Sequence, residues 1–197
     1  SRVDEVIFDA EHFFDGAAED EEYVMKVLEA ASQGGAEFLV LCDTNGGSLP
    51  GDISRLTNLV SERFEAKIGI HTHNDAGLAV ANSLAAVQSG ATMVQGTVNG
   101  YGERCGNANL VTVIPNLQLK MGYGCVPESR MPRLTQVART VDEITNYIPQ
   151  PQQPYVGRRA FSHKGGVHIN AVMKDPGTYE HVQPHHVGNR RRILASD

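Results

Sequence analysis

Two histidines one residue apart, His71 and His73, are the strongest candidates for chemistry in this sequence. They follow the run 66–70, in which Ile68 and Ile70 occupy every second position, as in a strand. Side chains two residues apart on a strand project to the same face, so the two imidazoles should lie side by side and could grip a metal. A pair of solvated or core histidines would have the same spacing, and spacing alone does not separate these alternatives.

A second polar motif, Asn99 to Asn107 (NGYGERCGN), follows in the same part of the chain. Two imidazoles with an amide or carboxylate oxygen suit a divalent metal with open positions, such as Mn, Mg or Zn. A substrate carbonyl bound there would be polarised, and Glu11 could act as the base that such chemistry needs. Glu103 and Arg104 either form an ion pair within their own loop or act directly, and both alternatives stay open.

The elements that must position these residues are four strands, each followed by a helix. The strands are predicted at 6–10, 36–42, 66–70 and 91–98, and the helices at 18–33, 50–64, 78–87 and after residue 107. We expect Asp15 and Gly16 to form a turn. A repeat of about thirty residues per unit is typical of parallel α/β architecture.

Polar side chains follow every one of these strands, namely Glu11 and His12, Asp43 and Thr44, the two histidines, and the 99–107 loop. A (β/α)8 barrel builds its site at this single face. The rival doubly wound sheet usually carries a glycine-rich phosphate turn after its first strand, and the sequence has none there. We therefore predict an α/β fold of the TIM (β/α)8-barrel type in which only about four βα units are present.

Four units would leave unpaired strand edges and an unfilled interior, so we expect a segment of a longer protein or a pair of copies. Residues 1–123 are predicted to be the second half of a TIM-barrel catalytic domain. Residues 124–154 are predicted to be a helix and a Pro/Gln-rich linker, and 155–197 the start of a small, mostly helical post-barrel subdomain.

Composition narrows the class of protein. With 41% hydrophobic and 20% charged residues the chain is ordinary for a soluble globular domain, and we expect no membrane partner. A net charge of −6 argues against a nucleic-acid partner. The basic run 190–192 is expected to be solvated, with a contact to a phosphorylated cofactor tail as the alternative. Three cysteines without ligand spacing fit a reducing, cytoplasmic location.

The two motifs together resemble the signature of the α-isopropylmalate, homocitrate and citramalate synthase family. The similarity is specific, because His71 to Asp75 and Asn99 to Asn107 match at the family's spacing, and it covers essentially the whole chain. Three further runs, at 9–16, 163–168 and 187–194, look most like the citramalate synthase branch. The family's Asp-Arg-Glu run, which supplies a carboxylate ligand and an arginine, does not occur in this sequence.

This resemblance implies an acyltransferase that condenses acetyl-CoA, as co-substrate, with a 2-keto acid by a Claisen reaction, followed by thioester hydrolysis. For the citramalate branch the acceptor is pyruvate, in branched-chain (isoleucine and leucine) amino-acid biosynthesis. The cofactor implied is a divalent metal (Mg, Mn, Zn or Co), and the assembly implied is a homodimer. We expect this chain by itself to be inactive, since half of the barrel is missing.

The resemblance also assigns roles by motif. It makes His71, His73 and, more weakly, Asn107 metal ligands, Glu11 a catalytic carboxylate, and Thr44 the residue that holds the keto acid's carboxylate. It implies that His168 acts in the active site of the neighbouring subunit, accompanied by Tyr179. The alternatives are a 2-isopropylmalate synthase, a hydroxymethylglutaryl-CoA lyase-like enzyme, and an inactive half-barrel.

Overall fold

The computed structural model describes residues 4–194, and the chain divides between Asn109 and Leu110 into two compact units. The elements of the first unit are β1 (Ile7–Ala10), α1 (Phe13–Glu19), α2 (Glu21–Gln33), β2 (Phe38–Asp43), α3 (Pro50–Arg63), β3 (Lys67–Thr72), α4 (Ala79–Gln88), β4 (Met93–Gln95) and the short 3-10 helix η1 (Val98–Gly100).

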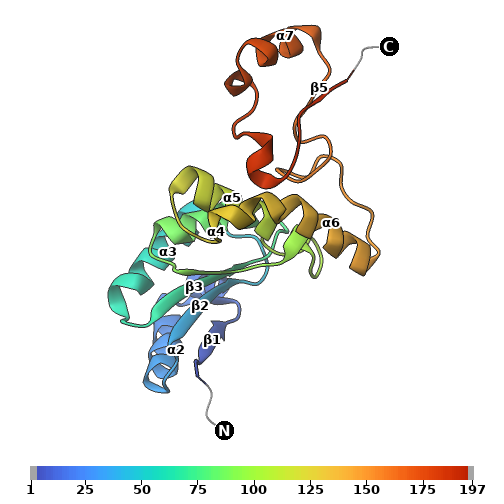
Figure 1. Cartoon of the computed structure of the whole chain (residues 1–197). Coiled ribbons are helices and arrows are strands. Elements are labelled where there is room, and N and C mark those ends of the chain that lie inside the picture. Colours follow the sequence, from blue (N-terminus) through green and yellow to red (C-terminus); the bar gives the residue numbers. More distant parts are fainter. Residues whose placement is uncertain (1–3, 195–197) are drawn as a thin grey trace. The chain divides into compact units, whose positions relative to one another are not determined.

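The four strands of this unit form one parallel sheet in the order β1-β2-β3-β4. Helices α1 to α4 connect the strands and share one hydrophobic core with one face of the sheet (Figure 1). The prediction of alternating strands and helices in an α/β fold is therefore confirmed. Val40 and Gly69 are register partners on β2 and β3, and a Cβ on Gly69 would come within 2.8 Å of Val40 Cγ2. This glycine leaves room for the Val40 side chain on the same face.

Strand alternation decides which side chains face the helices. Leu39, Leu41, Ile68 and Ile70 belong to the core beneath the helices. The residues between them, and those that follow the strands in the same phase, lie on the opposite face. That face therefore carries Asp9, Glu11, Cys42, Thr44, His71, His73 and Gln95.

The sheet is curved, with this second face concave. Gln95 Nε2 on β4 donates to Asp9 Oδ1 on β1 across a distance of 2.9 Å. In a flat sheet the two outer strands would lie about 14 Å apart, three strand spacings. Side chains on the outer strands therefore meet over the middle strands, as expected for part of a barrel wall.

The first helical segment differs from the prediction. Asp15 and Gly16 do not turn the chain, because α1 runs through them and buries Phe13, Phe14 and Ala17. A glycine suits this position, since a Cβ on Gly16 would lie 2.9 Å from Val24 Cγ1 of the next helix. The α2 helix then begins at Glu21, because the Asp20 side chain accepts a hydrogen bond from the Tyr23 N–H at 3.0 Å.

The second unit is mostly helical. Its elements are α5 (Leu110–Met121), η2 (Glu128–Arg133), α6 (Leu134–Thr145), β5 (Ser162–His163), α7 (Gly166–Lys174), η3 (Pro176–Thr178), η4 (Pro184–Val187) and β6 (Arg192–Ile193). The two short strands pair in parallel, with His163 beside Ile193. Within residues 4–194, no helix is both long and apolar enough to cross a membrane.

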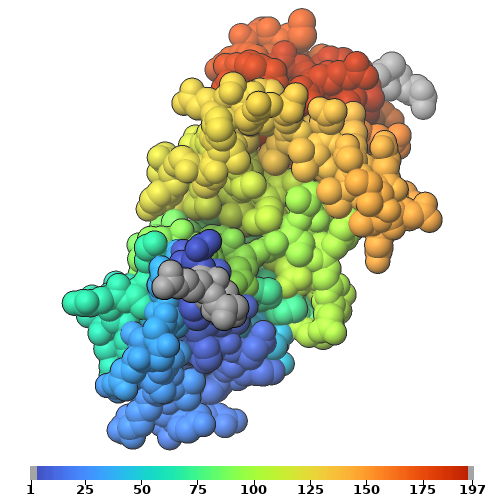
Figure 2. Space-filling view, turned by 60° about the horizontal axis from the view of Figure 1, so that its bottom comes forward, coloured from blue at the N-terminus to red at the C-terminus, as the bar shows by residue number. Residues whose placement is uncertain are grey.

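The division observed after Asn109 concerns compactness alone, and the three-part domain division at residues 123 and 154 stays a prediction. Strand β1 forms one edge of the sheet, and its first residue Ile7 and the preceding Val6 are each 43% exposed. The atoms of the first strand and helices lie at the surface in the space-filling view (blue, Figure 2). The edge thus presents the unpaired strand that the sequence predicts for a partial barrel.

Candidate active site

The two histidines of β3 lie side by side, as their spacing predicts. Their ring centroids are 5.2 Å apart, with the planes inclined at 47°. His71 Nε2 lies 3.0 Å from the Asn107 amide nitrogen, and His71 Nδ1 lies 2.9 Å from Gln95 Oε1. Because an amide nitrogen only donates, His71 Nε2 is the acceptor and Nδ1 carries the proton that is donated to Gln95. The tautomer of His71 is thus fixed by its two neighbours.

Gln95 is a functional candidate that sequence reasoning missed. Its amide oxygen accepts from His71, while its amide nitrogen donates to Asp9 Oδ1 at 2.9 Å. Asp9, Gln95, His71 and Asn107 therefore form one chain of hydrogen bonds across the concave face. The sequence gives only a weak indication of this role, because Gln95 is a polar residue at the end of a short strand. Its contact with β1 depends on the curvature of the sheet, which the sequence pattern does not indicate.

His73 is held differently. Its Nδ1 atom is buried and has no hydrogen-bond partner among residues 4–194. Burial lowers the pKa of His73, and His71 and Arg104 lower it further, so the ring is neutral near pH 7. A buried ring nitrogen without a partner costs free energy unless something binds to it. His73 therefore offers a ring nitrogen for which the described part of the chain supplies no partner.

These features fit a metal held by two imidazoles, since His71 Nε2 carries a lone pair and His73 Nδ1 is unpartnered. Asn107 faces His71 with its nitrogen, so it could ligate through oxygen only after its amide turned over. No group of three His, Cys, Asp or Glu side chains suited to a metal occurs in residues 4–194. The described residues thus supply part of a metal site without a carboxylate ligand.

The loop that carries Asn107 depends on glycine. Gly106 has φ +86°, and a Cβ there would collide with the Gly100 carbonyl oxygen. A Cβ on Gly102 would likewise collide with Asn107 Oδ1. The Asn107 N–H donates to the Gly100 carbonyl at 3.1 Å, which closes the loop. These glycines let the loop fold tightly enough to place Asn107 beside His71.

Glu11 and Thr44 come together from the ends of β1 and β2. The Thr44 hydroxyl donates to Glu11 Oε2 at 2.8 Å and accepts from the His12 N–H at 2.7 Å. His12 adopts the left-handed conformation, with φ 56°, where the chain turns from β1 into α1. This turn lets one hydroxyl bridge the two strand ends. The structure therefore brings together the predicted base and the predicted substrate-binding residue.

Cys42 lies on the same face but is unreactive. It is 1% exposed, and burial, together with the charges of Glu11 and Asp9, raises the pKa of its thiol to about 12. All three cysteines, Cys42, Cys105 and Cys125, are free thiols.

Arg104 pairs mainly with Asp75, not with Glu103. Arg104 Nε and Nη2 donate to the two Asp75 carboxylate oxygens at 2.8 and 3.0 Å, and Nη2 also donates to the Thr44 carbonyl at 2.7 Å. The nearest approach to Glu103 is 3.8 Å. The hydrogen bond from Arg104 lowers the pKa of Asp75. The sequence alternative of a Glu103 pair within the loop is thus secondary, because Arg104 ties the loop to the end of β2.

Asp43 is structural, in contrast to its grouping with the reactive residues. It is 1% exposed, and its Oδ1 accepts from the Ser48 hydroxyl at 2.8 Å. Its Oδ2 lies 3.5 Å from the amide nitrogen of the buried Asn82. Alternation places Asp43 on the helix side of β2, where it holds the 43–48 loop.

In the second unit, His168 and Tyr179 lie together. Their ring centroids are 4.5 Å apart and the planes are inclined at 32°. His168 is exposed, and Tyr179 is 46% exposed. The structure therefore groups the two residues to which the resemblance assigns a common role.

Models of two known protein families match most of the chain. The model of the HMGL-like family matches residues 1–141, and a second model, described as homocitrate synthase post-HMGL domain-like, matches residues 155–197. The chain is 58% identical over 197 residues to (R)-citramalate synthase of Aquifex aeolicus, with 99% of the chain and 37% of that protein covered. It is 55% identical over 200 residues to (R)-citramalate synthase of Synechocystis, with 98% of the chain and 37% of that protein covered.

The chain thus spans little more than a third of the length of these curated relatives. A probable 2-isopropylmalate synthase of Methanopyrus kandleri is 41% identical over 180 residues, with 91% of the chain and 36% of that protein covered. Among solved structures, the HMG-CoA lyase of Bacillus subtilis matches with a TM-score of 0.58 and 27% identity, covering 67% of this chain and 45% of that one. The TIM-barrel type of the fold is confirmed by these matches.

Proposed function

Because this chain belongs to the HMGL-like family, we propose that it forms part of an acyltransferase that condenses acetyl-CoA with a 2-keto acid, with pyruvate as the acceptor that gives citramalate. One observation carries the proposal. A pair of neighbouring imidazoles, of which His73 has an unpartnered ring nitrogen, and a Glu11–Thr44 pair lie on one face of the same curved sheet. The choice of pyruvate as acceptor rests on the name of the similar proteins, (R)-citramalate synthase.

His71 and His73, with Asn107 after its amide turns, would hold the divalent metal (Mg, Mn, Zn or Co). When bound, such a metal polarises the carbonyl of a keto acid as a Lewis acid. The Thr44 hydroxyl binds the keto acid's carboxylate. To do so it turns from Glu11, to which it donates in this structure. That exchange frees Glu11 Oε2 to accept a proton from the methyl group of acetyl-CoA.

Carbon–carbon bond formation then joins that methyl carbon to the keto carbon, and water cleaves the thioester to release CoA and the new carboxylate. His168 and Tyr179 complete the machinery by acting in the active site of the neighbouring subunit of a homodimer. This chain alone would be inactive, because the described residues lack the carboxylate ligand.

The second family match supports the synthase over the lyase alternative. Residues 155–197, which contain the His163 to His168 run, match a domain described for homocitrate synthase. The 2-isopropylmalate synthase alternative differs in acceptor, and the higher identity to citramalate synthases favours pyruvate. The enzyme would act in the cytoplasm, in the biosynthesis of isoleucine and leucine.

An assay of CoA release with the protein at its natural length tests this function. Acetyl-CoA is supplied with pyruvate, 2-ketoisovalerate or 2-oxoglutarate in separate reactions. Release with pyruvate well above the other two supports the proposal, and preference for 2-ketoisovalerate supports the isopropylmalate alternative. No release with any acceptor, in enzyme supplied with Mg or Mn, would refute the synthase reading.

A further inference from the structure

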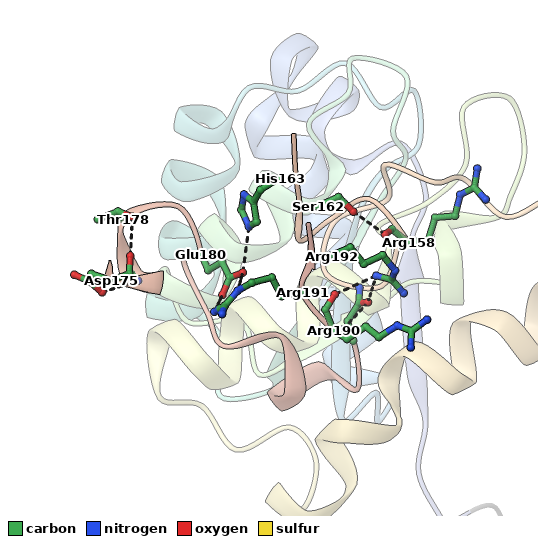
Figure 3. A network of polar contacts seen from close by, with 11 residues as sticks. Arg158, Ser162, His163, Asp175, Thr178, Glu180, Arg190, Arg191 and Arg192 are labelled. Carbon is green, nitrogen blue, oxygen red and sulfur yellow. Dashed lines mark hydrogen bonds and ion pairs between the residues drawn. The ribbon is translucent and has the colours of Figure 1, made fainter. Parts of the chain in front are cut away.

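A buried carboxylate, Glu180, joins three segments of the second unit. Its Oε1 and Oε2 accept from Arg191 Nε and Nη2, each at 2.7 Å, and its Oε1 also lies 3.1 Å from His163 Nε2. Figure 3 shows Glu180 between these two residues. His163 belongs to β5, and Arg191 directly precedes β6. Glu180 therefore links the 175–180 segment to both strands of the small sheet.

This arrangement is buried and highly directional. The Glu180 side chain is 2% exposed and that of His163 9%, whereas that of Arg191 is 33% exposed. The bidentate pair of hydrogen bonds from Arg191 fixes both the position and the plane of the Glu180 carboxylate. The basic run 190–192 is thus not wholly solvated, because Arg191 is committed to Glu180.

Residues 175–179, which precede Glu180, are also fixed at their N-terminal end. Helix α7 carries His168 and ends at Lys174, where Asp175 caps a turn by accepting from the Gly177 N–H at 2.9 Å. The Glu180 N–H donates to the Pro176 carbonyl at 2.9 Å, which closes this turn. Residue 179 consequently returns toward α7.

We propose that Glu180 is a positioning residue that holds Tyr179 against His168. Tyr179 lies between the capped turn and the anchored Glu180, so both flanks of its backbone are fixed. Its ring, which is 46% exposed, could turn into solvent, yet it lies 4.5 Å from the His168 ring. This inference rests on the proposed function only for the catalytic role of the pair. The positioning itself is a property of the fold.

The test is a magnetic resonance measurement on the protein at its natural length, labelled at histidine. An aromatic ring shifts the resonances of protons above its face, so the Cδ2 and Cε1 protons of His168 should report Tyr179. Tyr179→Ala sets the value without the ring. We expect Glu180→Gln to move the His168 resonances most of the way to that value, and Glu143→Gln, at an exposed carboxylate on α6, to leave them unchanged.

Arg191→Lys provides a second variant in case Glu180→Gln does not fold. It retains the positive charge and loses the two-pronged geometry, so it should move the His168 resonances part of the way. Resonances in Arg191→Lys and any folded Glu180→Gln that match the unmutated protein would overturn the proposal.

Kinetics separates this proposal from the proposed function. With loss of positioning, Glu180→Gln should lower kcat for CoA release about 10- to 100-fold, as a misplacement of about 1 Å does. The KM values for both substrates should stay within about twofold. If the variants show the predicted resonance shifts but the unmutated protein releases no CoA, the positioning role of Glu180 stands and the proposed synthase function fails. The opposite outcome is an unmutated protein that releases CoA and a Glu180→Gln variant with unshifted His168 resonances and an unchanged kcat. It would support the synthase function and overturn the positioning role of Glu180.

Discussion

Replacing Gln95 by leucine should weaken metal binding without removing either histidine. The substitution deletes the acceptor 2.9 Å from His71 Nδ1, so the ring loses the hydrogen bond that fixes its tautomer. It also deletes the donor to Asp9 Oδ1. The tautomer with the lone pair on His71 Nε2 is then held by the Asn107 contact alone.

The size of the effect follows from the exposure of the site. Loss of a hydrogen bond behind a metal ligand costs about 10- to 100-fold in affinity, or about 1.4 to 2.7 kcal/mol. His71 and Gln95 are both half-buried, so water can partly replace the lost acceptor. We therefore expect Gln95→Leu to fall toward the lower end, near tenfold.

Isothermal titration with MnCl2, on the protein at its natural length, measures this directly. Gln88→Leu, at an exposed position near the end of α4, is the matched control and should bind as the unmutated protein does. Gln95→Glu retains an acceptor for His71 Nδ1 and should lose less affinity than Gln95→Leu. An affinity of Gln95→Leu equal to that of the control, in folded protein, would refute the role given to the hydrogen-bond chain.

Three further predictions test other parts of the molecule. Glu11→Gln should lower kcat for CoA release by about 10²- to 10⁴-fold. Thr44→Val should mainly raise the KM for the keto acid. An unchanged kcat in the first variant, or an unchanged KM in the second, would remove that residue from the site. Gly69→Val should destabilise the fold by about 1–3 kcal/mol in urea unfolding, because its Cβ meets Val40, whereas Gly47→Ala, with open space around it, should change little. The hydrogen bond from Arg191 lowers the pKa of Glu180 from the ordinary 4.5, against the opposing effect of burial. A depressed folded-state pKa gives stability that is complete above the unfolded value and is lost as the pH falls through the folded one. The difference in unfolding free energy between the unmutated protein and Glu180→Gln should therefore shrink below pH 4.5, and a constant difference would contradict this.

Much of the first unit could be predicted because its signals are local. Alternation in the run before His71 places both imidazoles on one face, and the rings do lie 5.2 Å apart. The repeat of strand and helix predicts the parallel sheet. Where a local signal was misleading, as at Asp15 and Gly16, burial of Phe13 and Phe14 outweighed the turn propensity of the sequence.

What the sequence determined by itself, then, is the order of strands and helices and the shared face of the two imidazoles, because alternation along a strand is a local property. Only the tertiary structure decided their partners. The contact between Asp9 and Gln95, 86 residues apart, requires a curved sheet, which no alternation pattern encodes. Burial similarly makes Asp43 a structural group. Arg191 belongs to a basic run that is expected from the sequence to be solvated, but it pairs with Glu180. The role of a charged side chain depends on the groups that surround it after folding, because those groups set its solvation and its hydrogen bonds.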